Sequence, residues 1–186
     1  SGQVKALIVA GCLAQRYQHE IQKEIPEVHA IVGTTAIMDI VKAVNKALWG
    51  SPENFIAPLN EPPVSGKKRV MTTGGYYTYL KIAEGCDKHC TYCVIPKVRG
   101  SYRSVPVDTL LQEAEELVSK GVKELILVAQ EITLYGMDLY GRKALPELIT
   151  GLCRIEGLCW MRLLYCYPEE ITDELIQVIK KEDNVC

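Results

Sequence analysis

The chain has 186 residues, of which 48% are hydrophobic and 24% are charged, and its formal net charge is −2 at pH 7. This composition is typical of a globular protein with one or two hydrophobic cores, and it excludes a disordered or fibrous chain. The near-neutral charge gives no overall attraction for nucleic acid, and we find neither a membrane span nor a signal peptide. We therefore expect a cytoplasmic protein whose eight cysteines are reduced.

The first fifty residues alternate between strand-like and helix-like segments. In chain order these are Val4–Val9, Leu13–Ile25, His29–Val32 and a helix from about Thr35 to Gly50. Such an alternation implies a parallel sheet, and two strands cannot cover two helices, so we expect part of a larger flavodoxin-like α/β domain. Cys12 follows the first strand, at the edge where open α/β sheets bind ligands, but a small buried thiol is an equally good interpretation.

Residues 51–70 are rich in proline, serine, asparagine and glutamate. This composition favours neither helix nor strand and is typical of a linker. We therefore expect an N-terminal domain segment at residues 1–50, a linker at 51–70 and a second domain at 71–186.

Three strand–helix units follow the linker. Strands are expected at Tyr77–Ile82, Glu124–Ala129 and Trp160–Leu164, and helices at Val107–Lys120, Pro146–Arg154 and Thr172–Lys180. Such units build a curved parallel sheet with right-handed crossovers, which here is the first half of a TIM-like (β/α) barrel. We expect the outer edge of the third strand to be unpaired and prone to association.

The loop after the first of these strands carries a cysteine motif, C-x3-C-x2-C, formed by Cys86, Cys90 and Cys93. One inorganic centre can bind all three thiolates, which favours an iron–sulfur cluster or zinc. A 4Fe-4S cluster with three cysteine ligands keeps one iron open, whereas a structural zinc needs a fourth protein ligand, which here is His89.

A redox pair of Cys90 and Cys93 is a third interpretation of the cysteine motif. Redox pairs of this spacing open a helix. Pro96 and the pair Arg99–Gly100 instead predict a loop after the motif.

Several segments resemble the radical S-adenosylmethionine (SAM) methylthiotransferases. They are Val9–Tyr17, Tyr79–Pro96, Arg99–Gly100 with Tyr102–Ser104, and Arg162–Pro168. The resemblance covers nearly the whole chain and implies a 4Fe-4S cluster at the cysteine motif, with SAM on its open iron. It also implies a second 4Fe-4S cluster in the full-length enzyme, for which Cys12 is one ligand and the other two are absent. The chain would then be an internal fragment, which we expect to be inactive alone.

The resemblance also implies residues that bind the cofactor. Tyr92 is the aromatic residue that usually precedes the last cysteine of the motif. Gln130 and Glu131 follow the second barrel strand, and one of them is expected to accept a hydrogen bond from the amino group of SAM. Arg162 lies inside the third strand, where its charge needs either a carboxylate in the barrel or a structural salt bridge.

Two branches of this family differ in substrate. One adds a methylthio group to the β-carbon of an aspartate in the twelfth protein of the small ribosomal subunit, and the other modifies an adenosine of tRNA. Val128–Thr133 and Leu164–Pro168 are similar to the ribosomal-protein branch. We therefore expect a ribosomal protein or the ribosome as substrate and an electron donor such as flavodoxin. The alternatives are tRNA as the substrate, or a zinc-stabilised binding module without enzymatic activity.

Overall fold

The computed structural model describes residues 2–65, 69–72 and 74–186. The chain forms two compact units, and each is described here by itself. Unit 1 comprises Ser1–Pro62 and Asp87–Ser101, and unit 2 comprises Pro63–Cys86 and Tyr102–Cys186. The chain therefore leaves unit 2 directly after the first cysteine of the motif and returns to it at Tyr102.

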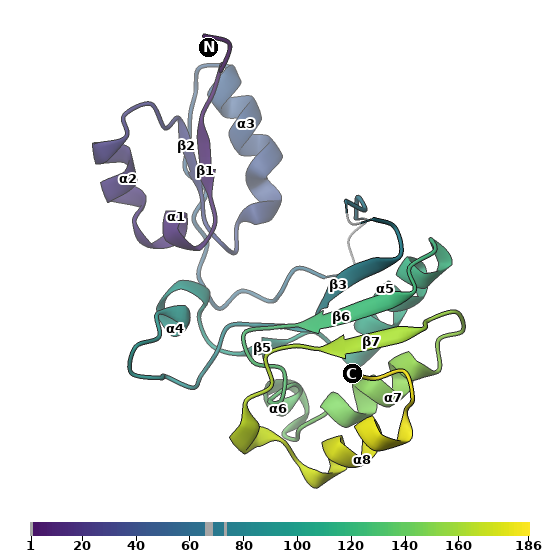
Figure 1. Cartoon of the computed structure of the whole chain (residues 1–186). Helices are drawn as coiled ribbons and strands as arrows, with labels where there is room; N and C mark the ends of the chain where they lie inside the picture. Colours follow the sequence, from purple (N-terminus) through teal and green to yellow (C-terminus); the bar gives the residue numbers. More distant parts are fainter. Residues whose placement is uncertain (1, 66–68, 73) are drawn as a thin grey trace. The chain divides into compact units, whose positions relative to one another are not determined.

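Unit 1 is a small parallel α/β arrangement (Figure 1). Its elements are β1 (Ile8–Ala10), α1 (Cys12–Arg16), α2 (Gln18–Glu24), β2 (Ala30–Val32), the 3-10 helix η1 (Ile37–Asp39), α3 (Ile40–Leu48) and α4 (Ile95–Arg99). Strands β1 and β2 pair in parallel, with Ile8 opposite Ala30. The single helix expected over residues 13–25 is two short helices, because the backbone of Tyr17 leaves the helical region (φ −112°, ψ 28°).

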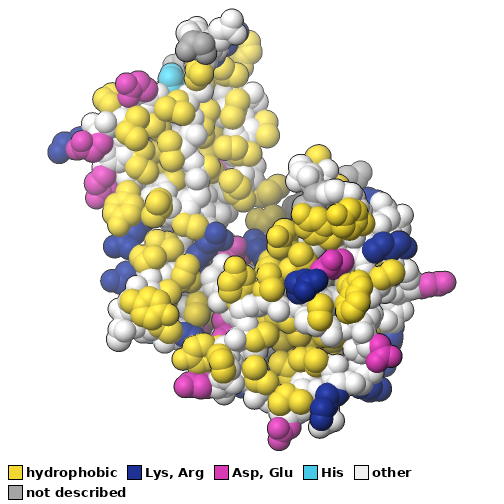
Figure 2. All heavy atoms as spheres, in the orientation of Figure 1, with side chains coloured by type: hydrophobic (Ala, Val, Ile, Leu, Met, Phe, Trp, Pro, Cys, Tyr) yellow, Lys and Arg dark blue, Asp and Glu magenta, His cyan; other side chains and the backbone are white. Residues whose placement is uncertain are grey.

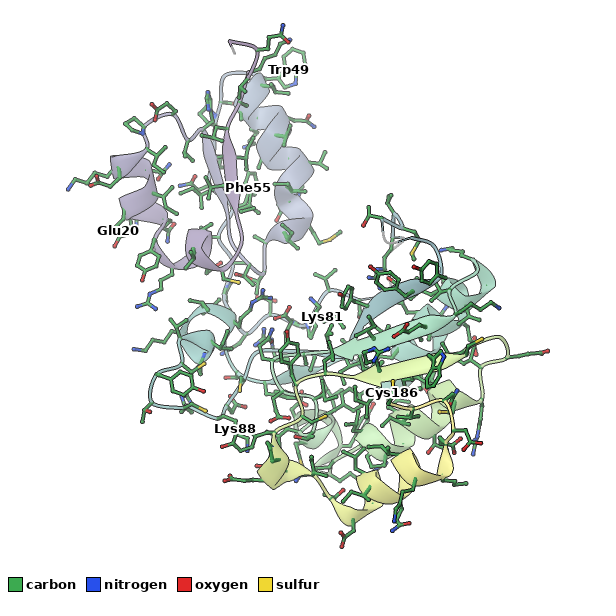
Figure 3. The ribbon with its side chains drawn as sticks, in the orientation of Figure 1. Glu20, Trp49, Phe55, Lys81, Lys88 and Cys186 are labelled. Carbon is green, nitrogen blue, oxygen red and sulfur yellow. The ribbon has the colours of Figure 1, made fainter. Side chains whose placement is uncertain are left out.

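Part of the proline-rich segment extends the sheet of unit 1. Phe55, which is labelled in Figure 3, forms a parallel bridge with Val32, and its N–H donates to the carbonyl oxygen of Ile31 at 2.8 Å. The side-chain oxygen of Asn54 accepts a hydrogen bond from the N–H of Ile31 at 2.9 Å. These residues satisfy backbone groups on the outer edge of β2, which would otherwise need water or another strand.

Unit 2 contains the longest strands and the longest helix. Its elements are β3 (Tyr77–Lys81), β4 (Ala83–Glu84), β5 (Arg103–Ser104), α5 (Val107–Ser119), β6 (Glu124–Val128), α6 (Met137–Tyr140), α7 (Leu145–Cys153), β7 (Trp160–Leu163), the 3-10 helix η2 (Pro168–Glu170) and α8 (Asp173–Lys181). The main sheet has the order β3–β6–β7 with both pairs parallel, and β4 and β5 form a separate antiparallel pair. The parallel α/β fold predicted from the sequence is thus confirmed.

The two faces of this sheet differ in their environment. Leu80, Leu125, Leu127 and Met161 are fully buried in one hydrophobic core with side chains of α5, α7 and α8. The alternate residues point to the other face, where Tyr79 on β3 is 45% exposed and Trp160 on β7 is 49% exposed. Figure 2 shows hydrophobic side chains gathered over these strands, with charged side chains among them.

The outer edge of β7 is paired, so the expectation that it would be open was wrong. The N–H of Met161 donates to the carbonyl oxygen of Asn184 at 2.7 Å, and the N–H of Leu163 donates to that of Cys186 at 2.8 Å. Figure 3 labels Cys186 beside β7. After α8 the chain returns parallel to β7, as expected for a further strand–helix–strand crossover. The last residues therefore cover the edge that was expected to promote association.

Short elements differ from the sequence-based expectation. The segment after the cysteine motif was expected to be a loop, but it contains the five-residue helix α4 with Pro96 in its first turn. Gly100, with φ 77°, ends this helix in a conformation that favours glycine. Within the part of the chain that the structure describes, none of the helices has the length and apolar character needed to span a bilayer.

Candidate functional site

The carboxyl ends of β3, β6 and β7 lie at one edge of the sheet in unit 2. β3 continues through β4 to Cys86, and β6 continues to Gln130 and Glu131. Barrels of parallel strands place their reacting groups in the loops at this edge. The topology of unit 2 therefore brings the first motif cysteine and these two predicted site residues to the same end of the sheet.

Cys86 is fixed by the backbone that precedes it. The side chain is buried, with 9% exposure, and it follows β4, in which Glu84 pairs with Arg103. Gly85 has φ 76°, and its N–H donates to Oε1 of Gln130 at 2.8 Å. The chain thus enters the cysteine motif from a strand that is hydrogen-bonded to β5.

Cys90 and Cys93 lie in the segment of unit 1 between Cys86 and α4. Both are partly exposed, and the N–H of Cys93 donates to the carbonyl oxygen of Cys90 at 2.9 Å in a turn. His89 is in a left-handed conformation with φ 48°, which is uncommon outside glycine. The backbone between residues 87 and 94 forms a turn and irregular structure.

Cys12 lies in unit 1 at the start of α1. Its thiol is partly exposed and follows Gly11, the residue after β1, which has φ 114°. Helix α1 packs against α4 within this unit. The helix that Cys12 begins therefore contacts the helix that follows Cys90 and Cys93 in the chain.

The donor chemistry of the cysteine motif fits an iron–sulfur cluster. None of the cysteines forms a disulfide within the described part of the chain. In that same part, no three His, Cys, Asp or Glu side chains form a group that could hold a metal ion. Three soft thiolates match a 4Fe-4S cluster with one open iron, whereas a structural zinc takes four protein ligands.

Glu131 joins the loops that follow β6 and β7. Its side chain is buried, with 3% exposure, and Oε1 accepts hydrogen bonds from the N–H of Thr133 at 2.7 Å and from the N–H of Tyr167 at 3.5 Å. The hydroxyl of Thr133 donates to the same oxygen. The carboxylate therefore organises the strand ends in this structure.

Arg162 lies on the exposed face of the sheet and forms an ion pair with Glu124. Its Nε and one terminal nitrogen both lie 2.9 Å from Oε1 of Glu124. This hydrogen bond raises the pKa of the Arg162 guanidinium. Glu124 is the first residue of β6, at the opposite end of the strand from Gln130. The structure thus directs Arg162 away from the two other predicted cofactor-binding residues of unit 2.

Tyr92 has a different environment from the other predicted site residues. Its side chain is 91% exposed, directly before Cys93. A flat aromatic ring in this position is open to contact by a ligand.

Sequence reasoning missed Tyr102 as a residue of this site. Its buried hydroxyl donates to the carbonyl oxygen of Glu131 at 2.7 Å, and burial, together with the charge of Glu131, raises its pKa. Tyr135 makes a similar bond, from its hydroxyl to the carbonyl oxygen of Val105 at 2.6 Å. Neither tyrosine lies in a periodic segment, so only the mixed apolar and polar character of the side chain marks them as buried hydrogen-bond donors.

Comparison with known proteins gives matches over the whole chain. The model of the Radical SAM superfamily matches residues 80–185. The chain is 57% identical over 186 residues to the ribosomal protein uS12 methylthiotransferase RimO of Lachnoclostridium phytofermentans, covering 100% of this chain and 42% of that protein. It is 49% identical over 189 residues to the protein of the same name from Clostridioides difficile, again covering 100% of this chain and 42% of the relative. The chain thus spans about 42% of the length of these curated relatives.

A solved structure has a similar fold. The radical S-adenosylmethionine methyltransferase TsrM from Kitasatospora setae matches with a TM-score of 0.64 and 14% sequence identity. The match covers 94% of this chain and 39% of that protein. At this identity the likeness concerns the fold alone.

Proposed function

Because the chain belongs to the radical SAM superfamily, whose model matches more than half of its residues, we propose that it is part of a radical SAM methylthiotransferase. The proposed reaction adds a methylthio group to the β-carbon of an aspartate in ribosomal protein uS12. The observation that carries this proposal is the 57% identity, over the whole chain, to a relative named for that reaction. The organisation of the strand ends in unit 2 around Cys86 supports it.

The proposed cofactors are a 4Fe-4S cluster and SAM. Cys86, Cys90 and Cys93 would ligate three irons of this cluster, and Cys12 would be one ligand of a second, auxiliary 4Fe-4S cluster. When bound, the first cluster and SAM would supply the radical chemistry that removes hydrogen from an unactivated carbon, sulfur would come through the auxiliary cluster, and a second SAM would supply the methyl group.

The residues around the cysteine motif would orient these groups. The exposed ring of Tyr92 is available to contact the cofactor next to Cys93. Glu131 keeps the loops after β6 and β7 together through its hydrogen bonds to Thr133 and Tyr167. Arg162 is held by Glu124, so it would have to leave this ion pair to contact SAM.

The proposed partners follow from this chemistry. Reduction of the cluster needs an electron donor, for which a flavodoxin is a suitable class. The proposed substrate is ribosomal protein uS12, free or in the small subunit, which would place the reaction in the cytoplasm.

A chimera tests the proposal in a full-length context. This chain would replace the matching residues of the Lachnoclostridium phytofermentans relative, and the chimera would be reconstituted anaerobically with iron and sulfide. We expect about four irons and four sulfides at the cysteine motif, beyond any auxiliary cluster, and methylthiolated uS12 by mass spectrometry. The Cys90→Ala chimera, as the matched control, should form no product.

Three outcomes would contradict the proposal. Zinc without iron at the cysteine motif would favour a binding module. Modified tRNA together with unmodified uS12 would favour the other branch of the family. An inactive chimera, tested beside an active unmodified relative, would mean that this chain does not supply the activity.

A further inference from the structure

A side chain from the loop after β6 holds the backbone next to the first motif cysteine. Oε1 of Gln130 accepts the N–H of Gly85 at 2.8 Å, across 45 positions of the sequence. From the sequence, either Gln130 or Glu131 was expected to accept a hydrogen bond from the amino group of SAM. In the structure the side-chain oxygen of Gln130 instead binds the residue directly before Cys86.

The conformation of Gly85 makes this contact specific. Gly85 is buried and has φ 76°, a left-handed conformation that residues with a β-carbon rarely adopt. A buried N–H needs an acceptor, and Gln130 provides it from another strand end. The direction in which the chain leaves β4 therefore depends on both residues.

The residues between β3 and Gly85 are held by successive hydrogen bonds. The N–H of Ile82 donates to the carbonyl oxygen of Val128 at 3.0 Å, and the N–H of Val105 donates to that of Ile82 at 2.9 Å. Ala83 and Glu84 then pair with β5. The bond to Gln130 is the next contact along this path, and it is the one that lies beside Cys86.

The three motif cysteines differ in burial and in how firmly hydrogen bonds hold the backbone that precedes them. Cys86 is buried and follows a hydrogen-bonded path, whereas Cys90 and Cys93 are partly exposed in irregular backbone. A ligand whose backbone is already fixed loses less conformational freedom when it binds a metal centre. Cys86 is therefore the preorganised ligand of the motif.

We propose that Gln130 is a positioning residue for the iron–sulfur cluster, which it stabilises by fixing the backbone of Gly85 and thereby the thiolate of Cys86. This inference rests on the proposed function, because it requires a cluster at the cysteine motif. It differs from the role expected from the sequence in one testable respect. Gln130 acts on the cluster before SAM is bound.

The test compares three variants of the anaerobically reconstituted protein in the absence of SAM. Gln130→Leu removes the acceptor at similar size, Gln130→Glu keeps an oxygen acceptor, and Gln112→Leu makes the same change on the exposed side of α5. Two quantities are measured: the rate of cluster loss to an iron chelator, and the hydrogen-exchange rate of the Gly85 amide. Near-UV and far-UV circular dichroism establish that each variant is folded.

We expect Gln130→Leu to lose its cluster about three- to ten-fold faster than the wild type, which corresponds to the loss of one hydrogen bond. Exchange of the Gly85 amide should rise by a similar factor. Gln130→Glu should keep the protection of this amide, and Gln112→Leu should match the wild type in both measurements.

The outcomes separate this inference from the proposed function. If the wild type assembles no iron–sulfur cluster, the proposed function fails, and the inference fails with it. If the wild type holds its cluster and Gln130→Leu changes neither the rate of cluster loss nor Gly85 exchange, only the positioning role is refuted. SAM binding to the same variants is then measured separately, and a weaker affinity of Gln130→Leu with unchanged cluster stability would refute the positioning role in favour of a contact with SAM.

Discussion

At the scale of single residues, the contacts of the candidate site join parts of the chain that lie far apart in the sequence. Gln130 and Glu131 were located at the end of a strand because parallel sheets gather functional loops at that edge. Their partners, Gly85 and Tyr167, lie tens of residues away, and no local pattern encodes a contact of that kind. Arg162 was expected to need a carboxylate, and the structure provides Glu124 on the neighbouring strand.

Cys153, outside the candidate site, gives a prediction for the pH dependence of stability. Its thiol lies 3.3 Å from Oδ1 of Asn184, and burial raises its pKa from 9.0 to about 11, with a smaller effect from the charge of Glu182. The folded state thus favours the protonated thiol. Its contribution to stability is fully present below about pH 9 and is lost as the pH rises through about 11.

We therefore predict that the difference in free energy of unfolding between wild type and Cys153→Ala shrinks between about pH 9 and about pH 11. Denaturant unfolding at a series of pH values measures this difference. The contributions of the other titrating groups to the free energy of unfolding cancel in it, because both proteins contain those groups. Cys159→Ala, at an exposed thiol, is the control. Parallel pH profiles for wild type and Cys153→Ala would contradict the prediction.

At the scale of elements, the length of a segment decided whether the sequence revealed it. Helices α5, α7 and α8 were predicted within a few residues because each repeats apolar residues over several turns. The antiparallel pair of β4 and β5 has two residues in each strand, and α4 and α6 have only five and four residues. Segments of that length contain at most about one period of either pattern, which is too little to recognise, so their structure depends on tertiary contacts.

The packing of α5 against α7 depends on a glycine. A β-carbon built on Gly151 in α7 would lie 3.0 Å from Cδ2 of Leu111 in α5, which is closer than ordinary van der Waals contact. Glycine weakens a helix interior, so its presence here is explained by the close approach of the two helices. The hydrophobic contacts of Leu111 with the core would be lost if the helices moved apart.

We predict that Gly151→Leu lowers the free energy of unfolding by about 1–3 kcal/mol, because the larger side chain overpacks this contact. Leucine is a good helix former, so a loss cannot come from helix propensity. The double variant Gly151→Leu/Leu111→Ala should lose at least about 0.5 kcal/mol less free energy of unfolding than the sum of the two single losses. A double-mutant cycle measured by denaturant unfolding gives this difference. Strict additivity would mean that the two side chains do not compete for the same space.

At the scale of the whole molecule, the chain changes between the two units three times. The proline-rich residues 51–70 include the point between Pro62 and Pro63 where unit 1 gives way to unit 2. The second and third changes of unit, after Cys86 and after Ser101, lie in segments without any shift in composition. Their positions depend on contacts such as that of α4 with α1, which a pass along the sequence does not reveal.

The hydrophobic cores of the two units differ strongly in their side chains. The two clusters of unit 1 consist of small and medium-sized residues: Ala30, Val32, Ala36 and Ala43 in one, and Ala14, Val28 and Ile31 in the other. The core of unit 2 is continuous and contains many large side chains, among them Leu80, Leu110, Leu127, Tyr135 and Leu148. Apolar burial is the main favourable term in folding, so unit 1 should have the lower local stability.

This contrast leads to a prediction for native-state hydrogen exchange. Amides of β2 should exchange faster than those of β6, because local opening of unit 1 exposes less apolar surface.

Leu148→Ala, at a fully buried position of α7, should destabilise unit 2 by about 2–5 kcal/mol and accelerate exchange in β6. Exchange in β2 should remain close to that of the wild type if unit 1 opens separately. Equal acceleration in both strands would contradict this, because it would mean that the two units unfold as a single cooperative structure.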